Sequence, residues 1–232
     1  MPKAIKRKKK HKDIAVETEV QDRISDIKEL MKRKQKAVIM YGSVAAIGVA
    51  VVVGLLFYKY TSDEKAHQLE YEAYKVYHGE YQKNPLSKQE QFSKASDLFN
   101  QAYSKSKSPR LLLYIASCYS EAEKYQDALK TLDIFFNKYS SEKNLLPLAY
   151  KQAASLHLKM GNKAEALKAL DTLYKLQGDI FKDLALIETA RILEGDGKKD
   201  EATAKYKELT EKFKDSPFID EATAKLGEKK EG

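Results

Sequence analysis

The 232-residue sequence has no tryptophan, a single cysteine and only four histidines. One cysteine, Cys118, excludes an intrachain disulfide. The histidines are scattered and no CxxC or HExxH motif occurs, so the common zinc-binding patterns are missing. No nucleophile, acid and base fall into a catalytic pattern either. We therefore expect no metal, no cofactor and no catalytic residue, which predicts that the protein is not an enzyme.

Long hydrophobic runs are also scarce, and a mean hydropathy of −0.59 excludes a protein that crosses a membrane many times. The exception is residues 37–58, a run of 22 residues without a charged side chain, AVIMYGSVAAIGVAVVVGLLFY. At about 1.5 Å per residue, such a helix crosses the roughly 30 Å hydrocarbon core of a bilayer. The run is longer than the apolar region of a cleavable signal peptide and lacks a small-x-small cleavage site at its end. It predicts an uncleaved, single-pass transmembrane signal anchor.

Positive charge is concentrated before this span. Residues 1–36 carry 13 Lys and Arg against 6 Asp and Glu, which accounts for seven charges of the formal net charge of +8. A basic segment beside a span is more typical of residues that set membrane orientation and attract anionic lipid than of a nucleic-acid site. We therefore expect no nucleic-acid partner. The twenty residues before the span contain six Lys and Arg, and the twenty after it contain three. This bias predicts a cytoplasmic N-terminus, with residues 59–232 across the membrane.

A stripe of small residues runs along the predicted span, at Gly42, Ala46, Ala50 and Gly54. Small residues at every fourth position permit close approach of a second helix. The stripe is a candidate contact for a homodimer or for the span of a partner.

Residues 15–35 are predicted to form an amphipathic helix before the span. Their apolar side chains recur at helical spacing, at Val16, Val20, Ile24, Ile27 and Met31. The pattern leaves three roles open: contact with anionic lipid, a short coiled coil, or docking to a cytoplasmic protein.

The chain beyond residue 62 is predicted to be all-α, because it reads as helices separated by Pro and Gly breaks without an alternating strand pattern. Four similar segments, FSKASDLF, YQDALKTL, KAEALKAL and KDEATAKY, recur at intervals of 33, 38 and 36 residues, with alanines in register at Ala95, Ala128, Ala166 and Ala202. Twelve residues before the last three stand further alanines, Ala116, Ala154 and Ala190. A period near 34 residues indicates a solenoid of stacked helix pairs. The two alanines of each pair would let its helices pack closely.

These segments resemble tetratricopeptide repeats. The residues that match the signature of that family are Leu112, Ile115, Ala116, Tyr119, Ala128, Leu132 and Phe135 in the best repeat, and Leu186, Ala190, Leu193, Ala202, Tyr206 and Leu209 in the last. His157 departs from the pattern, since an aromatic is usual there. We predict an all-α fold in three parts: residues 1–36 as a basic tail, 37–58 as the anchor, and 59–232 as an α-solenoid of about three to four helix pairs. Residues 217–226 are expected to cap the last repeat.

The family resemblance implies a groove that binds proteins, lined by the first helix of each pair. The family's groove positions fall on Arg110, Leu113, Ser117, Leu148, Lys151, Ser155, Leu184, Ile187 and Arg191. Apolar side chains mixed with three cations suit an extended apolar segment that carries an acid or a C-terminal carboxylate.

The layout as a whole resembles the YfgM-like ancillary subunits of the bacterial SecYEG translocon. That resemblance implies an inner-membrane protein whose periplasmic repeat domain binds the translocon, chaperones or client polypeptides. Two alternatives remain open: a scaffold that organises the envelope during cell division or wall synthesis, and an organellar import receptor.

A reporter enzyme fused after Gly232 tests the predicted topology. Because positive charge flanks the span on its N-terminal side, a periplasmic alkaline phosphatase fusion is expected to be active and a cytoplasmic β-galactosidase fusion inactive. Activity of the β-galactosidase fusion alone would show that residues 59–232 lie in the cytoplasm, opposite to this prediction.

Overall fold

The computed structural model describes residues 10–80 and 86–227, with side chains described from Glu19 onward. Every regular element within these ranges is a helix. The chain divides into two compact units, residues 1–60 and residues 61–232. The first nine residues of the predicted basic tail lie outside the described residues.

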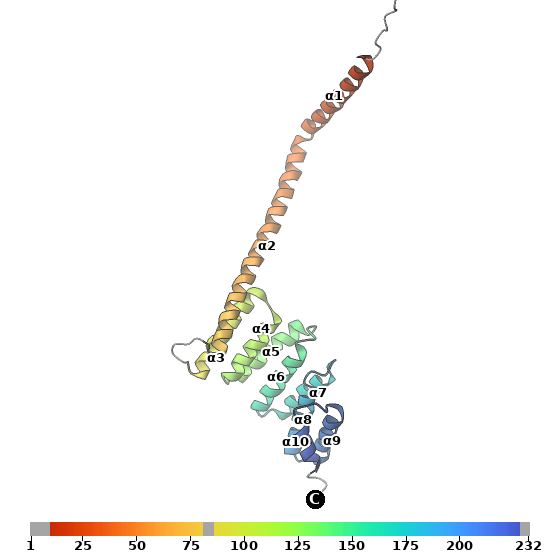
Figure 1. Cartoon of the computed structure of the whole chain (residues 1–232). Helices are drawn as coiled ribbons and strands as arrows, with labels where there is room; N and C mark the ends of the chain where they lie inside the picture. Colours follow the sequence, from red (N-terminus) through yellow and green to blue (C-terminus); the bar gives the residue numbers. More distant parts are fainter. Residues whose placement is uncertain (1–9, 81–85, 228–232) are drawn as a thin grey trace, which may run out of the picture. The chain divides into compact units, whose positions relative to one another are not determined.

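The first unit contains α1 (Lys10–Arg33) and most of the apolar part of α2 (Gln35–Tyr77) (Figure 1). Lys34 stands alone in a turn between the two helices. By length and composition α2 can cross a membrane, and none of its most apolar window is buried against the rest of the protein. The apolar side chains of residues 38–58 are therefore exposed in the isolated chain, as they would be to lipid.

Helix α2 does not end with the apolar segment. It continues without a break to Tyr77, so the predicted boundary between residues 58 and 59 falls inside one helix. The reason is local, because no Gly or Pro falls between Leu55 and Tyr77 to interrupt the helix. Its last turns belong to the second unit, where Ala66, Glu70 and Ala73 are buried.

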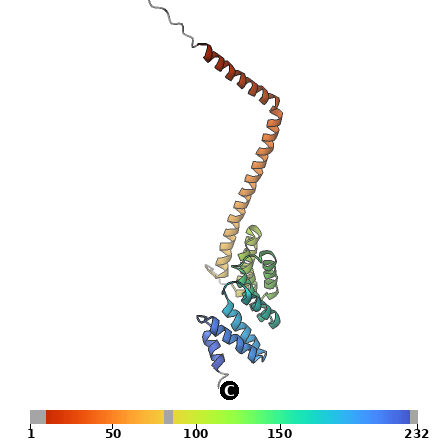
Figure 2. The ribbon, with the colours of Figure 1, turned by 90° about the vertical axis from the view of Figure 1, so that its right-hand side faces the viewer.

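The second unit is a series of antiparallel helix pairs that follow one another in chain order (Figures 1 and 2). This arrangement confirms the predicted all-α solenoid. The end of α2 packs beside α3, where the Tyr74 and Phe99 rings lie 5.3 Å apart. The remaining helices are α3 (Lys88–Ser106), α4 (Pro109–Glu121), α5 (Tyr125–Tyr139), α6 (Leu146–Lys159), α7 (Lys163–Lys175), α8 (Lys182–Gly195), α9 (Lys199–Lys212) and α10 (Ile219–Gly227).

The predicted alanine pairs lie at the centre of these helix pairs. Each repeat places one alanine on its first helix and one on its second, and all are buried: Ala116, Ala128, Ala154, Ala166, Ala190 and Ala202. Helices with small residues at their contact can approach more closely than helices with large ones. The period in the sequence therefore records a packing requirement that recurs in each repeat.

The turn within each repeat also recurs. Glu123, Gly161 and Gly197 occupy the same position between the two helices, and all three have positive φ, 61°, 76° and 76°. In each turn the following backbone N–H bonds to a carbonyl five residues earlier, at 2.8–2.9 Å. Glycine adopts this left-handed conformation without a steric cost, whereas a side chain carries one. Glu123 is thus a strained version of a turn that two other repeats build with glycine.

Helix α10 packs on the last helix pair, the place expected for residues 217–226. Ala222 is buried, and Phe218, Ile219 and Leu226 pack around the core of α8 and α9. This covers the apolar surface that a further repeat would otherwise cover.

Replacing Glu123 by glycine should stabilise the protein by about 0.5–1 kcal/mol, because glycine removes the strain at positive φ. Urea denaturation of the purified chain in mild detergent, followed by circular dichroism, measures the change. Glycine at Lys130, an exposed position inside α5, is the matched control and should destabilise by about 1 kcal/mol. A loss of stability at both positions would contradict the strain at Glu123.

Candidate protein-binding groove

The predicted groove residues lie on the first helices of three successive repeats. Each helix carries three of them: α4 holds Arg110, Leu113 and Ser117, α6 holds Leu148, Lys151 and Ser155, and α8 holds Leu184, Ile187 and Arg191. Their environments differ widely, so the structure separates them into residues that line a cavity, residues in ion pairs and residues in the core.

A cavity of about 290 Å³ lies between α4 and α6. Four of the predicted residues line it together: Ser117, Leu148, Lys151 and Ser155. Tyr77 at the end of α2 contributes an aromatic ring, and the remaining lining residues are Ala116, Ser120, Glu121, Gln152, Leu156 and Lys159. The surface therefore combines apolar patches with hydroxyl and amide groups.

Gln152 is a lining residue that the sequence analysis missed. Its Nε2 donates to the Leu113 carbonyl at 3.2 Å and to Ser117 Oγ at 2.8 Å, so it bridges α6 to α4. Its Oε1 is buried and has no hydrogen-bond partner among the described residues. The available signal was helical spacing, because Gln152 stands four residues after Leu148 and three before Ser155, on the same face of α6.

The cations of the cavity are held by neighbours within the chain. Lys151 Nζ lies 4.5 Å from the centroid of the Phe181 ring. Lys159 Nζ donates to Ser120 Oγ at 3.0 Å and lies 4.0 Å from Glu121 Oε1. Both lysines remain partly exposed to solvent. Their contacts with Phe181, Ser120 and Glu121 are therefore of the weak kind found at protein surfaces.

Arg110 and Arg191 are engaged in ion pairs. Arg110 Nη2 donates to Glu70 Oε1 at 2.5 Å, and that carboxylate is only 7% exposed. A buried carboxylate needs its charge partner, because an unpaired charge in the interior is costly. The guanidinium of Arg110 thus compensates Glu70 in this structure.

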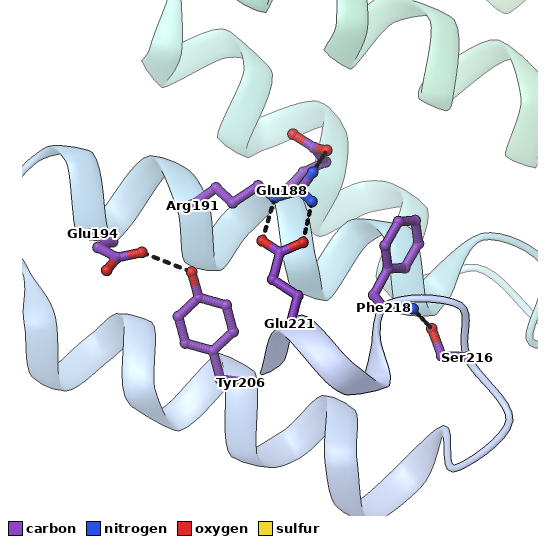
Figure 3. Close-up of polar contacts among 7 residues, drawn as sticks. All are labelled: Glu188, Arg191, Glu194, Tyr206, Ser216, Phe218 and Glu221. Carbon is purple, nitrogen blue, oxygen red and sulfur yellow. Dashed lines mark hydrogen bonds and ion pairs between the residues drawn. The ribbon is translucent and has the colours of Figure 1, made fainter. Parts of the chain in front are cut away.

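Arg191 joins the last repeat to the capping helix (Figure 3). Its Nε and Nη2 donate to the two carboxylate oxygens of Glu221 on α10, at 2.8 and 2.5 Å, and its Nη1 donates to Glu188 at 2.6 Å. The hydrogen bonds from Arg191 lower the pKa of Glu221, and Glu221 in turn raises the pKa of Arg191. In the same region, the Tyr206 hydroxyl donates a hydrogen bond to Glu194 Oε2 at 2.8 Å (Figure 3).

The other predicted residues lie away from the cavity. Leu113 and Ile187 are at most 2% exposed and belong to the core. Leu184 is half-buried on α8 and is not among the lining residues of the α4–α6 cavity. The structure therefore brings four of the nine positions into one site.

The small-residue stripe of the predicted span lies on an open face of α2. A Cβ built at Gly42 or Gly54 meets no atom within 4 Å in the described part of the chain. The surface is free for a second helix, and the homodimer contact through Gly42, Ala46, Ala50 and Gly54 stays a prediction.

The thiol of Cys118 is fully buried in the core. Burial raises the pKa of this thiol to about 12, so it is protonated near neutral pH. Within the described residues no group of three His, Cys, Asp or Glu side chains could hold a metal ion.

Comparison with known proteins supports the repeat assignment. The family model of a tetratricopeptide repeat-like domain matches residues 28–227, which is most of the chain. A search of characterised proteins finds no significant sequence match.

Changing Glu221 to glutamine should loosen the capping helix. The paired carboxylate has a lowered pKa, so it stabilises the fold above the pKa of an unfolded glutamate, about 4.3, and this stabilisation is lost as the pH falls through the lowered value. Because both side chains are more than a third exposed, we expect only about 0.5–1 kcal/mol after solvent screening. Amide hydrogen exchange in α10 should accelerate about two- to five-fold at neutral pH.

Glu211 provides the control for this experiment, because its ion pair with Lys207 is exposed and lies within α9. Its change to glutamine should leave α10 exchange unaltered. Equal exchange in the Glu221 variant and the parent at neutral pH would show that the Arg191 contact does not hold α10.

Proposed function

We propose, from the premise that this chain belongs to the tetratricopeptide repeat-like family, that it is a membrane-anchored scaffold that binds other proteins through the cavity between α4 and α6. Function in this family resides in recognition surfaces, and the fold alone does not specify the partner. The chemistry of the cavity therefore indicates the kind of partner.

The cavity suits an extended polypeptide segment. Leu148 and Tyr77 offer apolar contact, while Ser117, Ser120 and Ser155 offer hydroxyl groups that can donate to or accept from a peptide backbone. Gln152 adds a carbonyl oxygen without a partner among the described residues. Backbone contacts of this kind recognise an extended chain with little dependence on its sequence.

Charge recognition contributes less than the family resemblance implied. Arg110 and Arg191 are held by Glu70 and Glu221, and only Lys151 of the three predicted cations lines the cavity. A ligand that relied on a carboxylate would have to compete with these internal partners. We therefore favour client polypeptide segments over acidic C-terminal tails.

The membrane anchor supports a role close to protein export. The apolar part of α2 can span a bilayer, and the charge bias before it favours a cytoplasmic N-terminus. A repeat domain held at the outer face of a bacterial inner membrane would meet polypeptides that emerge from the translocon and the chaperones that receive them. This placement, with the SecYEG translocon as the neighbouring machinery, is the proposal that the layout supports best.

Site-specific photocrosslinking tests the proposed site. A photoreactive amino acid at Ser155, an exposed residue of the cavity, should capture exported polypeptides, chaperones or translocon subunits from intact membranes. The same amino acid at Ala164, an exposed position on α7 outside the lining of the cavity, is the matched control. We expect at least a several-fold higher yield from position 155.

Two outcomes would overturn parts of this proposal. Equal yields from positions 155 and 164 would exclude the cavity as the binding site. Capture of cell-division or wall-synthesis proteins in place of export factors, with a fluorescent fusion concentrated at the septum, would favour the envelope-organising alternative. An export factor should instead be distributed around the membrane.

A further inference from the structure

Helix α1 has an apolar stripe that the described structure leaves uncovered. Val20, Ile24, Ile27 and Met31 recur at intervals of four, three and four residues, and each is between 47% and 62% exposed. Leu30, three residues after Ile27 and four after Asp26, lies at the border of the stripe and is 57% exposed. A stripe of this size on a helix needs a partner surface, because large apolar side chains are unfavourable in water.

From Glu19 onward the acidic residues of α1 lie away from the stripe, whereas Glu17, three residues before Val20, is in register with it. Asp22, Asp26 and Glu29 each stand two positions after a stripe residue, Val20, Ile24 and Ile27 respectively. Two positions correspond to about 200° around a helix of 3.6 residues per turn. Glu19 falls on this face as well, three residues before Asp22. The four acids thus point away from the surface that the stripe would contact.

The basic side chains border the stripe on both sides. Arg23 lies three residues after Val20 and one before Ile24, which places it along one edge. Lys28 lies four residues after Ile24, along the other edge, and Lys32 follows Lys28 by one further turn. Arg33 lies on the acidic face and pairs with Glu29 at 3.5 Å, and Arg23 pairs with Glu19 at the same distance.

This segregation of charge points to the surface of an anionic membrane. A helix in the membrane interface buries its apolar stripe at the boundary with the acyl chains, while Lys and Arg at the edges extend to lipid phosphates. Acids on the far face remain in water and avoid repulsion by the lipid. We propose that α1 lies along an anionic bilayer surface, next to the span in α2; this inference rests on the proposed membrane anchoring.

Sequence adjacency supports the same arrangement. Lys34, in the turn that separates α1 from α2, is the single residue between the stripe-bearing helix and the helix that contains the span. If α2 crosses the bilayer, α1 is held within reach of the headgroups, and the remaining cost of binding is small. The basic residues 1–12 would add to the attraction.

A coiled coil between two copies fits the stripe less well. The heptad core would include only Val20, Ile24, Ile27 and Met31, because the next core positions in the sequence, 17 and 34, are Glu and Lys. Stable coiled coils need about three to four heptads. Two copies anchored with the same topology would pair in parallel, and Arg23 of one copy would then face Lys28 of the other, a repulsive contact between flanking positions.

Lipid contact can be measured on the full chain reconstituted in vesicles, in a Cys118→Ala background. A spin label is placed at one of three positions: Ile24 on the stripe, Asp26 on the acidic face, or Ala46 within the span. With 30% phosphatidylglycerol, the label at position 24 should be several-fold more accessible to oxygen than to a water-soluble relaxation agent. The label at position 26 should show the reverse, and pure phosphatidylcholine should reduce the contrast several-fold.

Matched charge changes separate the edge of the stripe from net charge. Lys28→Glu and Arg33→Glu change the net charge equally, but only Lys28 borders the stripe. Lys28→Glu should abolish the lipid contact at position 24, and Arg33→Glu should leave it. Equal effects of the two changes would contradict recognition by the edge lysine.

The label at position 46 distinguishes failure of this inference from failure of the anchor. Lipid contact at position 46 without contact at position 24 would overturn the interfacial helix alone, and water exposure at both would overturn the anchoring as well. Dipolar broadening between labels at position 24, without lipid contact, would establish the coiled coil in its place. If the label at position 24 loses its exposure to water only when a cytoplasmic protein is added, the stripe binds that protein and not the lipid.

Discussion

The close approach of two helices at a pair of alanines is the constraint on which the repeat unit depends. Ala116 and Ala128 in one repeat, and their counterparts in the next two, occupy the buried centre of each helix pair. Larger residues there would separate the helices and change the stacking of all later repeats. Larger side chains, such as Phe99 and Phe135, are buried in the same core. The spacing of the repeats and the cavity between α4 and α6 follow from this arrangement.

Ionic contacts within the chain shape the recognition surface as much as the groove residues do. Glu70 is buried and holds Arg110, and Glu221 holds Arg191 through two hydrogen bonds. These contacts tie the end of α2 to α4, and the capping helix α10 to α8. They also remove two cations from the surface that a ligand could use, and they leave a cavity dominated by hydroxyl, amide and apolar groups. Its selectivity should therefore arise from shape and backbone hydrogen bonds.

The two units present their apolar residues differently. In the repeats the apolar side chains pack against neighbouring helices, whereas in α1 and the first part of α2 they remain exposed within the isolated chain. The exposed set divides further: residues 38–58 are apolar all round, which suits a span, and α1 has a narrow stripe with segregated charge, which suits an interface. One membrane could satisfy both, because each surface matches a different depth of the bilayer.

The sequence by itself determined the helical class, the repeat period, the apolar segment and the capping helix, because each depends on local spacing and residue size. The resemblance to tetratricopeptide repeats implied the helix faces that carry Ser117, Leu148 and Ser155. Only the tertiary structure decided which of these faces form a cavity and which cations are free. The reason is separation along the chain: Glu70 stands 40 residues before Arg110, and Glu221 stands 30 after Arg191. Periodicity within one helix carries no record of partners that distant, so the internal ion pairs became visible only in the folded chain.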